Sequence, residues 1–211
     1  QHTTETNYAA LRSFFAKFPH FVQNDFYIAG ESYGGVYVPL LALQVLRHRF
    51  PVNFKGVAIG NGLLDPPSLL GDSNRQFFFY HGFQDTLQED VGPNDIKNFN
   101  VYNIYQDCEY RPEFLGKFSK SLNLPPLPLC KNFFILKGYF NRKSVQKAIN
   151  IDPSWNGHWT YFNTRIYGAY VRNVRKESLR VEVKHLVDSG IKVVIYNGDV
   201  DSVFNFIGDK A

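Results

Sequence analysis

The feature that most constrains the fold of this chain is a serine held between glycines at the junction of two apolar segments. Gly30, Ser32 and Gly34 form a Gly-x-Ser-x-Gly sequence, with the apolar run 26–29 before it and a helical pattern over 36–50 after it. A serine hydroxyl becomes a usable nucleophile when it projects from a sharp turn toward a base, and glycines permit such a turn without Cβ clashes. Ordinary glycine-rich turns can carry the same sequence. The strand, turn and helix order nevertheless predicts a nucleophile elbow with Ser32 as its catalytic residue.

Helices and strands alternate around this segment. Apolar residues at helical spacing predict a first helix over about 7–18, and the short apolar run 56–60 is typical of a buried strand. The β-branched run 191–196 predicts another strand after a helix that ends near Leu186. One face of that helix is expected to carry Leu179, Val183, Leu186 and Val187. The alternation predicts an α/β fold with a parallel sheet and flanking helices.

The regular pattern loosens between residues 65 and 140, where prolines and glycines interrupt aromatic segments. We interpret this range as a shortened, cap-like excursion inserted into a single domain that covers residues 1–211. The chain begins with Gln1 and contains no methionine. We therefore expect it to be an internal fragment of a longer precursor, incomplete at both ends of the domain.

Composition excludes several classes of protein. The 211 residues are 44% hydrophobic and 20% charged, as in a soluble globular domain, and the net charge of +4 is dispersed. The densest basic stretch, 172–180, contains Glu177, so a solvated helix face is favoured over a nucleic-acid site. The longest apolar run, 36–46, is shorter than the roughly 20 residues that span a bilayer. We expect neither nucleic-acid nor membrane binding.

Two cysteines, Cys108 and Cys130, flank a proline-rich segment. A metal site is disfavoured because no histidine or further cysteine lies at ligand spacing. Buried free thiols and a disulfide both remain open on the residues alone.

Acidic residues follow the strand predicted at 191–196. The sequence Asn197-Gly198-Asp199-Val200-Asp201 places carboxylates just past the strand end, where hydrolases with a serine elbow carry the acid of their triad. In hydrolases of this fold a Gly-x-x-Asp sequence after the strand usually delivers the acid, and this spacing from Gly198 selects Asp201 over Asp199. Two ordinary acidic turn residues are the alternative.

The chain resembles the serine carboxypeptidase family of the α/β-hydrolase fold. The matching segments run through the whole sequence. They are Gly30-Glu31-Ser32-Tyr33-Gly34-Gly35 with Tyr37-Val38-Pro39, Gly60-Asn61-Gly62, Tyr80-His81-Gly82, Tyr102-Asn103-Ile104-Tyr105, Tyr196 to Asp201, Asn205-Phe206 and Gly208-Asp209.

This resemblance implies a role for each matching residue. Ser32 would attack the last peptide bond of a peptide or protein, and the backbone N–H of Tyr33 would supply half of the oxyanion hole. Glu31 would share a proton with a second acid and bind the terminal carboxylate of the substrate, which implies an acidic optimum. Asp201 would orient a histidine base. The implied substrate-binding set is Glu31, Asn61, Val203 and Phe204, and core packing explains Val203 and Phe204 equally well.

The resemblance also bears on the cysteines and on cofactors. It implies a disulfide between Cys108 and Cys130 and therefore an oxidising compartment, lysosomal or secretory. It implies no cofactor and no metal. Oligomeric state is not predicted.

The triad base is missing from the expected place. All six histidines precede Asp201, and the glycine-rich oxyanion loop of the family would lie before Gln1. Loss of triad members costs about 10⁴-fold in rate, so the chain as written is expected to be inactive. His158 could be considered as a substitute base, but a surface or satisfied core histidine is the better interpretation. His158 and Phe204 stand where the family usually has cysteines, which gives modest support to an inactive binding or stabilising homologue. An acyltransferase of the same fold is a third possibility.

Overall fold

The computed structural model describes residues 2–66, 72–85, 99–108, 132–161, 163, 166, 168–169 and 177–210. The chain forms two compact units, one of residues 1–90 with 176–211 and one of residues 91–175. The excursion predicted at 65–140 does not coincide with the second unit. Helix α4 (Asp72–Tyr80) falls in the first unit, where it packs against α10 (Phe206–Lys210), and residues 141–161 fall in the second.

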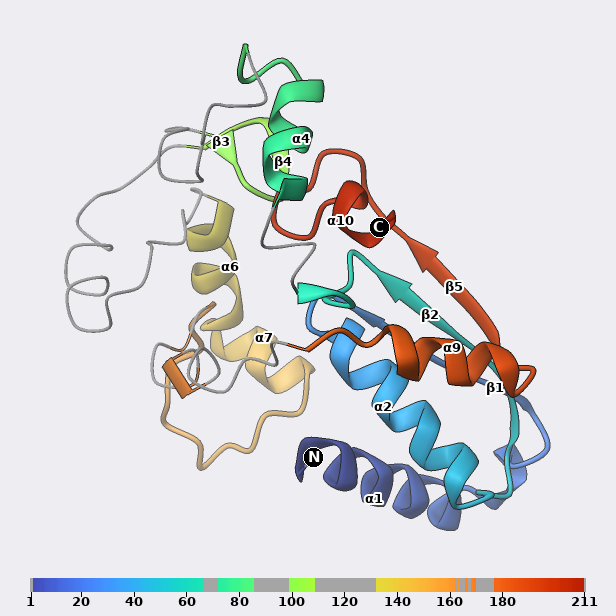
Figure 1. The fold of residues 1–211 in the computed structure, drawn as a ribbon. Coiled ribbons are helices and arrows are strands. Elements are labelled where there is room, and N and C mark those ends of the chain that lie inside the picture. Colours follow the sequence, from blue (N-terminus) through green and yellow to red (C-terminus); the bar gives the residue numbers. More distant parts are fainter. Residues whose placement is uncertain are drawn as a thin grey trace. The chain divides into compact units, whose positions relative to one another are not determined.

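A parallel sheet organises the first unit. Its strands are β1 (Asp25–Glu31), β2 (Asn53–Gly60) and β5 (Lys192–Tyr196), in the order β1-β2-β5 (Figure 1). Ala29 of β1 pairs with Ala58 of β2, which pairs in turn with Val194 of β5. All three predicted strands and their parallel arrangement are confirmed. Because the strands are parallel, their carboxyl ends lie at one edge of the sheet, and the serine turn and the acidic loop both follow that edge.

Helices pack beside the sheet. Helix α1 (His2–Lys17) contacts α2 (Gly34–Arg47), and α2 contacts β1, β2 and α9 (Arg180–Asp188). A short 3-10 turn, η1 (Pro19–Phe21), links α1 to β1. The apolar core lies between α2, α9 and the sheet and consists of Ile28, Val38, Ala42, Val45, Val57, Ile59, Leu64 and Leu186. The predicted helices therefore form, with α1 beginning five residues earlier than expected.

Three of the four residues predicted to share one face of α9 are buried or half-buried, and the fourth is exposed. Leu179 and Leu186 are fully buried and Val183 is half-buried, but the side chain of Val187 is 54% exposed. Leu179, Val183 and Leu186 follow one another at intervals of four and three residues, which keeps them on one narrow stripe of the helix surface. Val187 lies at the edge of that stripe, one residue before the helix ends at Asp188.

The described residues of the second unit include a short antiparallel ladder and the helices α6 and α7. Strand β3 (Phe99–Asn100) pairs with β4 (Asn103–Asp107), and α6 (Asn132–Phe140) is followed by α7 (Lys143–Ala148). Between the helices, the Asn141 side chain bonds the backbone N–H and C=O of Trp159. Among the helices that the structure describes, none has both the length and the apolar character needed to cross a membrane.

Candidate active site

Ser32 lies in a sharp turn between β1 and α2, as predicted. Its backbone φ is +59°, a left-handed conformation that residues with a side chain seldom adopt. The turn is held by the neighbouring strand, because the Ser32 N–H donates to the Gly60 carbonyl at 3.0 Å. The Ser32 carbonyl in turn accepts from the Leu63 N–H at 3.0 Å. A strained residue kept in place by surrounding hydrogen bonds is the signature of a nucleophile elbow.

The glycines around Ser32 are not equally constrained. A Cβ at Gly30 would lie 2.7 Å from the Val38 side chain, whereas a Cβ at Gly34 would meet nothing within 4 Å. At Gly35, a Cβ would lie 2.4 Å from the Leu63 nitrogen and 2.7 Å from the Gly62 carbonyl carbon. The close approach of α2 to the turn after β2 therefore depends on Gly35, which follows the Gly-x-Ser-x-Gly motif and which motif spacing alone did not single out.

Tyr33 is the N-cap residue of α2, and Gly34 is the first residue of the helix. Backbone N–H groups at a helix N-terminus point away from the helix and carry partial positive charge. This position suits the donor role predicted for the Tyr33 N–H, because an oxyanion formed next to Ser32 would lie at the start of α2.

Asp201 follows β5 and is 9% exposed. One of its oxygens, Oδ1, accepts from the Val203 N–H at 2.7 Å. Burial raises the pKa of Asp201 to about 6, against the lowering effect of the Val203 and Phe204 N–H groups, and the negative charges of Glu31 and Asp209 raise it further. The carboxylate of Glu31, exposed at the end of β1, is thus within electrostatic reach of Asp201.

The predicted substrate-binding residues have defined contacts in the structure. The Asn61 amide bonds Gly198 and Phe204 of the acidic loop. Phe204 packs beside a cluster formed by Val36, Leu63 and Leu179, and Val203 is half-buried. Packing therefore accounts for Phe204, while the substrate-binding roles of Asn61, Val203 and Phe204 stay predictions.

An open depression of about 440 Å³ lies over the elbow. Ser32, Glu31 and Tyr33 line it together with Asn7 of α1 and Tyr37 of α2. The predicted nucleophile, a helix N-terminus and a carboxylate thus face one solvent-accessible space.

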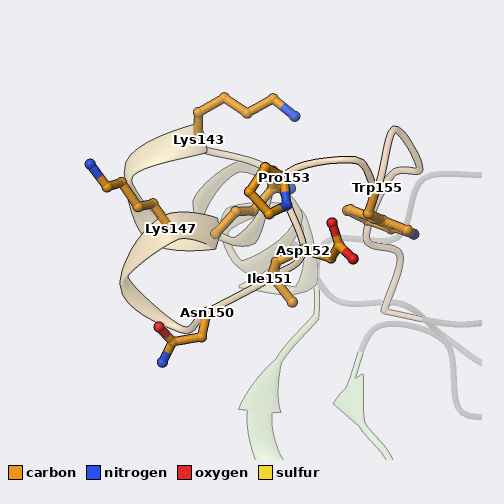
Figure 2. A pocket seen from close by; sticks show the side chains of 8 residues that line it. Lys143, Lys147, Asn150, Ile151, Asp152, Pro153 and Trp155 are labelled. Atoms are coloured by element: carbon orange, nitrogen blue, oxygen red, sulfur yellow. The ribbon is translucent and has the colours of Figure 1, made fainter.

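A larger depression, of about 540 Å³, lies in the second unit and contains none of the predicted site residues. It is lined by α7 and the loop after it (Figure 2). Lys147 extends away from the Asp152 carboxylate, and Asp152 is occupied by hydrogen bonds from the Ser154 N–H and hydroxyl. Without convergent polar groups, this depression is a weaker candidate for chemistry than the elbow.

Three of the histidines that the structure describes have a polar partner within their own compact unit. His48 contacts the Gln44 side chain, His81 contacts the Phe77 carbonyl, and the exposed His158 contacts Asn141 at 3.3 Å. The interpretation of His158 as a surface histidine agrees with this geometry.

Cys108 is buried and is not a free thiol. Cys130 lies outside the described residues, so the Cys108–Cys130 pairing stays a prediction.

Two polar residues of the site escaped the sequence reasoning. Asn205 is fully buried and bonds the Asn74 and Ser73 side chains of α4, while its Oδ1 accepts from the Gly208 N–H at the start of α10. Burial raises the pKa of Asp209 to about 6, although Asn197 donates to its Oδ2 at 2.7 Å. The sequence places both residues in segments that match the family but predicts no role for either, because no local pattern distinguishes a buried polar residue from an exposed one.

Comparisons with known proteins agree with this geometry. The family model described as serine carboxypeptidase matches residues 1–91 and 84–211. The chain is 33% identical to the serine carboxypeptidase ctsa-4.1 of Caenorhabditis elegans, covering 95% of the chain and 52% of that protein. It is 34% identical to the serine carboxypeptidase-like 37 protein of Arabidopsis thaliana, covering 99% of the chain and 48% of that protein. With the lysosomal protective protein of Mus musculus the identity is 26%, over 98% of the chain and 54% of that protein.

A solved structure shares the fold. The prohormone-processing carboxypeptidase Kex1(delta)p of Saccharomyces cerevisiae superposes with a TM-score of 0.63 at 22% identity, over 94% of the chain and 49% of that structure. The chain spans about half the length of the curated relatives it matches.

Proposed function

The chain belongs to the serine carboxypeptidase family and has its α/β-hydrolase fold, and on this premise we propose that the protein is a serine-type carboxypeptidase. It releases C-terminal residues from peptides and proteins. The observation that supports the proposal most is the strained backbone of Ser32 just before α2. The turn after β2 forms hydrogen bonds with the Ser32 backbone and also with the loop that carries Asp201. Nucleophile and acid are thereby held at the same sheet edge.

The chemistry proceeds in two steps. The Ser32 oxygen forms a bond to the carbonyl carbon of the last peptide bond, and its proton passes to a histidine base, which the proposal takes from the full-length protein outside these 211 residues. The oxyanion is stabilised by the Tyr33 N–H at the helix N-terminus. When the C–N bond breaks, the leaving amine takes the proton from the histidine and departs as the C-terminal residue. Water then hydrolyses the acyl-enzyme with the same base, which regenerates Ser32.

Asp201 and Glu31 have separate tasks in this proposal. Asp201 accepts a hydrogen bond from the histidine and stabilises its imidazolium form. Glu31, exposed at the rim of the depression over Ser32, contributes to binding the terminal carboxylate as one member of a proton-sharing acid pair. The same family resemblance implies an acidic lysosomal or secretory compartment.

A labelling experiment tests the proposal. The full-length protein is treated with a fluorophosphonate probe, and the modified residue is identified by mass spectrometry beside the Ser32→Ala variant. Labelling of Ser32 and release of single C-terminal residues from peptides are the expected results. Absence of both would favour the inactive homologue, and labelling with transfer from acyl-glucose donors, but without peptide cleavage, would favour an acyltransferase.

A further inference from the structure

We infer that Asn61 is a positioning residue whose side-chain amide fixes the loop that carries Asp201. The inference rests on the proposed function, in which Asp201 is the triad acid. It gives Asn61 a different task from the substrate-binding role that the family resemblance implied. The hydrogen bonds around Asn61 carry the argument.

Both polar atoms of the Asn61 amide are engaged with the acidic loop. Asn61 Oδ1 accepts from the Gly198 N–H at 3.1 Å, and Asn61 Nδ2 donates to the Phe204 carbonyl at 3.1 Å. Gly198 and Phe204 each lie three residues from Asp201, on opposite sides. One amide therefore closes residues 198–204 into a ring with Asp201 at its centre, using one of its two N–H donors and one of its two acceptor lone pairs.

The same turn also bonds the nucleophile. Gly60 and Leu63, on either side of Asn61, make the two backbone hydrogen bonds that hold Ser32. The Asn61 N–H itself donates to the Tyr196 carbonyl at the end of β5. Residues 60–63 thus connect the elbow to the acidic loop, and a shift of the Asn61 side chain changes the position of Asp201 relative to Ser32.

The residue type fits this task closely. Asn61 has φ of +39°, a region in which asparagine is enriched among residues with side chains. Its planar amide carries a donor and an acceptor on one short side chain. The loop presents one N–H and one C=O, so a single amide can bond both. Asn197 adds a weaker bond of 3.4 Å to the Phe204 carbonyl, so Asn61 provides the shorter contact.

Two variants separate the backbone effect from the amide effect. Asn61→Gly keeps the left-handed backbone at no steric cost and removes both side-chain bonds. Asn61→Asp keeps the shape but, when ionised, places a carboxylate oxygen against the Phe204 carbonyl, whereas its protonated form has one donor and one acceptor as asparagine does. Asn141→Ala is the matched control, since Asn141 also bridges a loop by both amide atoms, in the second unit.

Steady-state kinetics on the full-length protein give the first readout. We expect Asn61→Gly to lower kcat by about 10²-fold, the loss typical of a displacement near 1 Å in a catalytic group, with KM changed less than about threefold. Asn61→Asp should lose less activity at low pH than at neutral pH. The pH profile of Asn61→Asp is divided by that of the wild type, because the carboxyls of Asp201, Asp209 and Glu31 also lie near the loop. Asn141→Ala should leave kcat unchanged.

Hydrogen exchange gives a second readout that needs no activity. Peptides covering 197–205 should lose amide protection in Asn61→Gly and keep it in Asn141→Ala. A rise in KM with unchanged kcat would overturn the inference and return Asn61 to substrate binding, and so would unchanged protection of the loop. If the wild type cleaves no peptide, the proposed function fails while the exchange experiment still decides whether Asn61 holds the loop.

Discussion

Gly34 and Gly35, the two adjacent glycines after Ser32, should change thermal stability in opposite directions when each is replaced by alanine. A Cβ at Gly35 would lie 2.4, 2.7 and 2.9 Å from backbone atoms of Leu63 and Gly62, and backbone atoms cannot rotate away as a side chain can. Gly35→Ala must therefore push the turn after β2 away from α2. That displacement also strains the hydrogen bond from the Leu63 N–H to the Ser32 carbonyl.

The magnitude follows from three contributions. Overpacking costs about 1–3 kcal/mol, and the weakened hydrogen bond costs about 1 kcal/mol. Better helix propensity returns up to about 1 kcal/mol. The net loss for Gly35→Ala is about 2 kcal/mol, or a fall in Tm of roughly 4–8 °C for a protein of this size. The Cβ of Gly34→Ala would meet no atom within 4 Å, so this variant gains only the better helix propensity of alanine. Its Tm should therefore equal or exceed that of the wild type.

Thermal unfolding of the full-length wild type and both variants measures the difference, and fluorophosphonate labelling rates report on Ser32. Gly35→Ala should also label more slowly, because the turn that it displaces holds the serine backbone. Equal Tm losses in the two variants, or a wild-type Tm in Gly35→Ala, would refute the close approach between α2 and the turn.

Two further predictions concern the proposed catalytic residues. Ser32→Gly should unfold at a higher temperature than Ser32→Ala, because only glycine relieves the left-handed strain. The expected difference in the free energy of unfolding is about 1 kcal/mol. Equal stabilities of the two variants would contradict this prediction. The folded-state pKa of Asp201 is raised to about 6, so its stabilising contribution is full below pH 4 and is lost as the pH rises through 6. The Tm of Asp201→Asn should consequently rise relative to the Tm of the wild type as the pH is raised from 4 to 7. A difference between the two Tm values that does not change with pH would show that the carboxyl is not buried as described.

The sheet and the elbow were predictable because their signals are local. The run 191–196 is apolar and β-branched, and β5 forms over Lys192–Tyr196. The serine turn is set by strand, glycine and helix patterns that lie within about 25 residues. The exposure of Val187 was not predictable, because a periodic pattern gives the direction of a helix face but not where the helix stops packing.

The supporting contacts of the site could not be predicted in the same way. Gly35 and Gly62 meet across 27 positions in the sequence, and Asn61 reaches residues more than 130 positions away. Such contacts depend on the order of strands in the sheet, which sets β2 between β1 and β5. A motif identifies the residues that carry the chemistry, whereas the residues that hold them become visible only when distant segments are placed side by side.

The position of Asp201 has a consequence for the base that it would orient. Burial and the charge of Glu31 raise the pKa of the Asp201 carboxyl to about 6, so the free acid is favoured in a mildly acidic compartment. A triad acid acts as an anion, and an imidazolium beside it supplies the positive charge that offsets both effects. Protonation of the histidine and ionisation of Asp201 are therefore coupled, so the pair would titrate together rather than as two independent groups. In this site the histidine would be held most strongly in its charged form, which is the form present after it has taken the proton of Ser32.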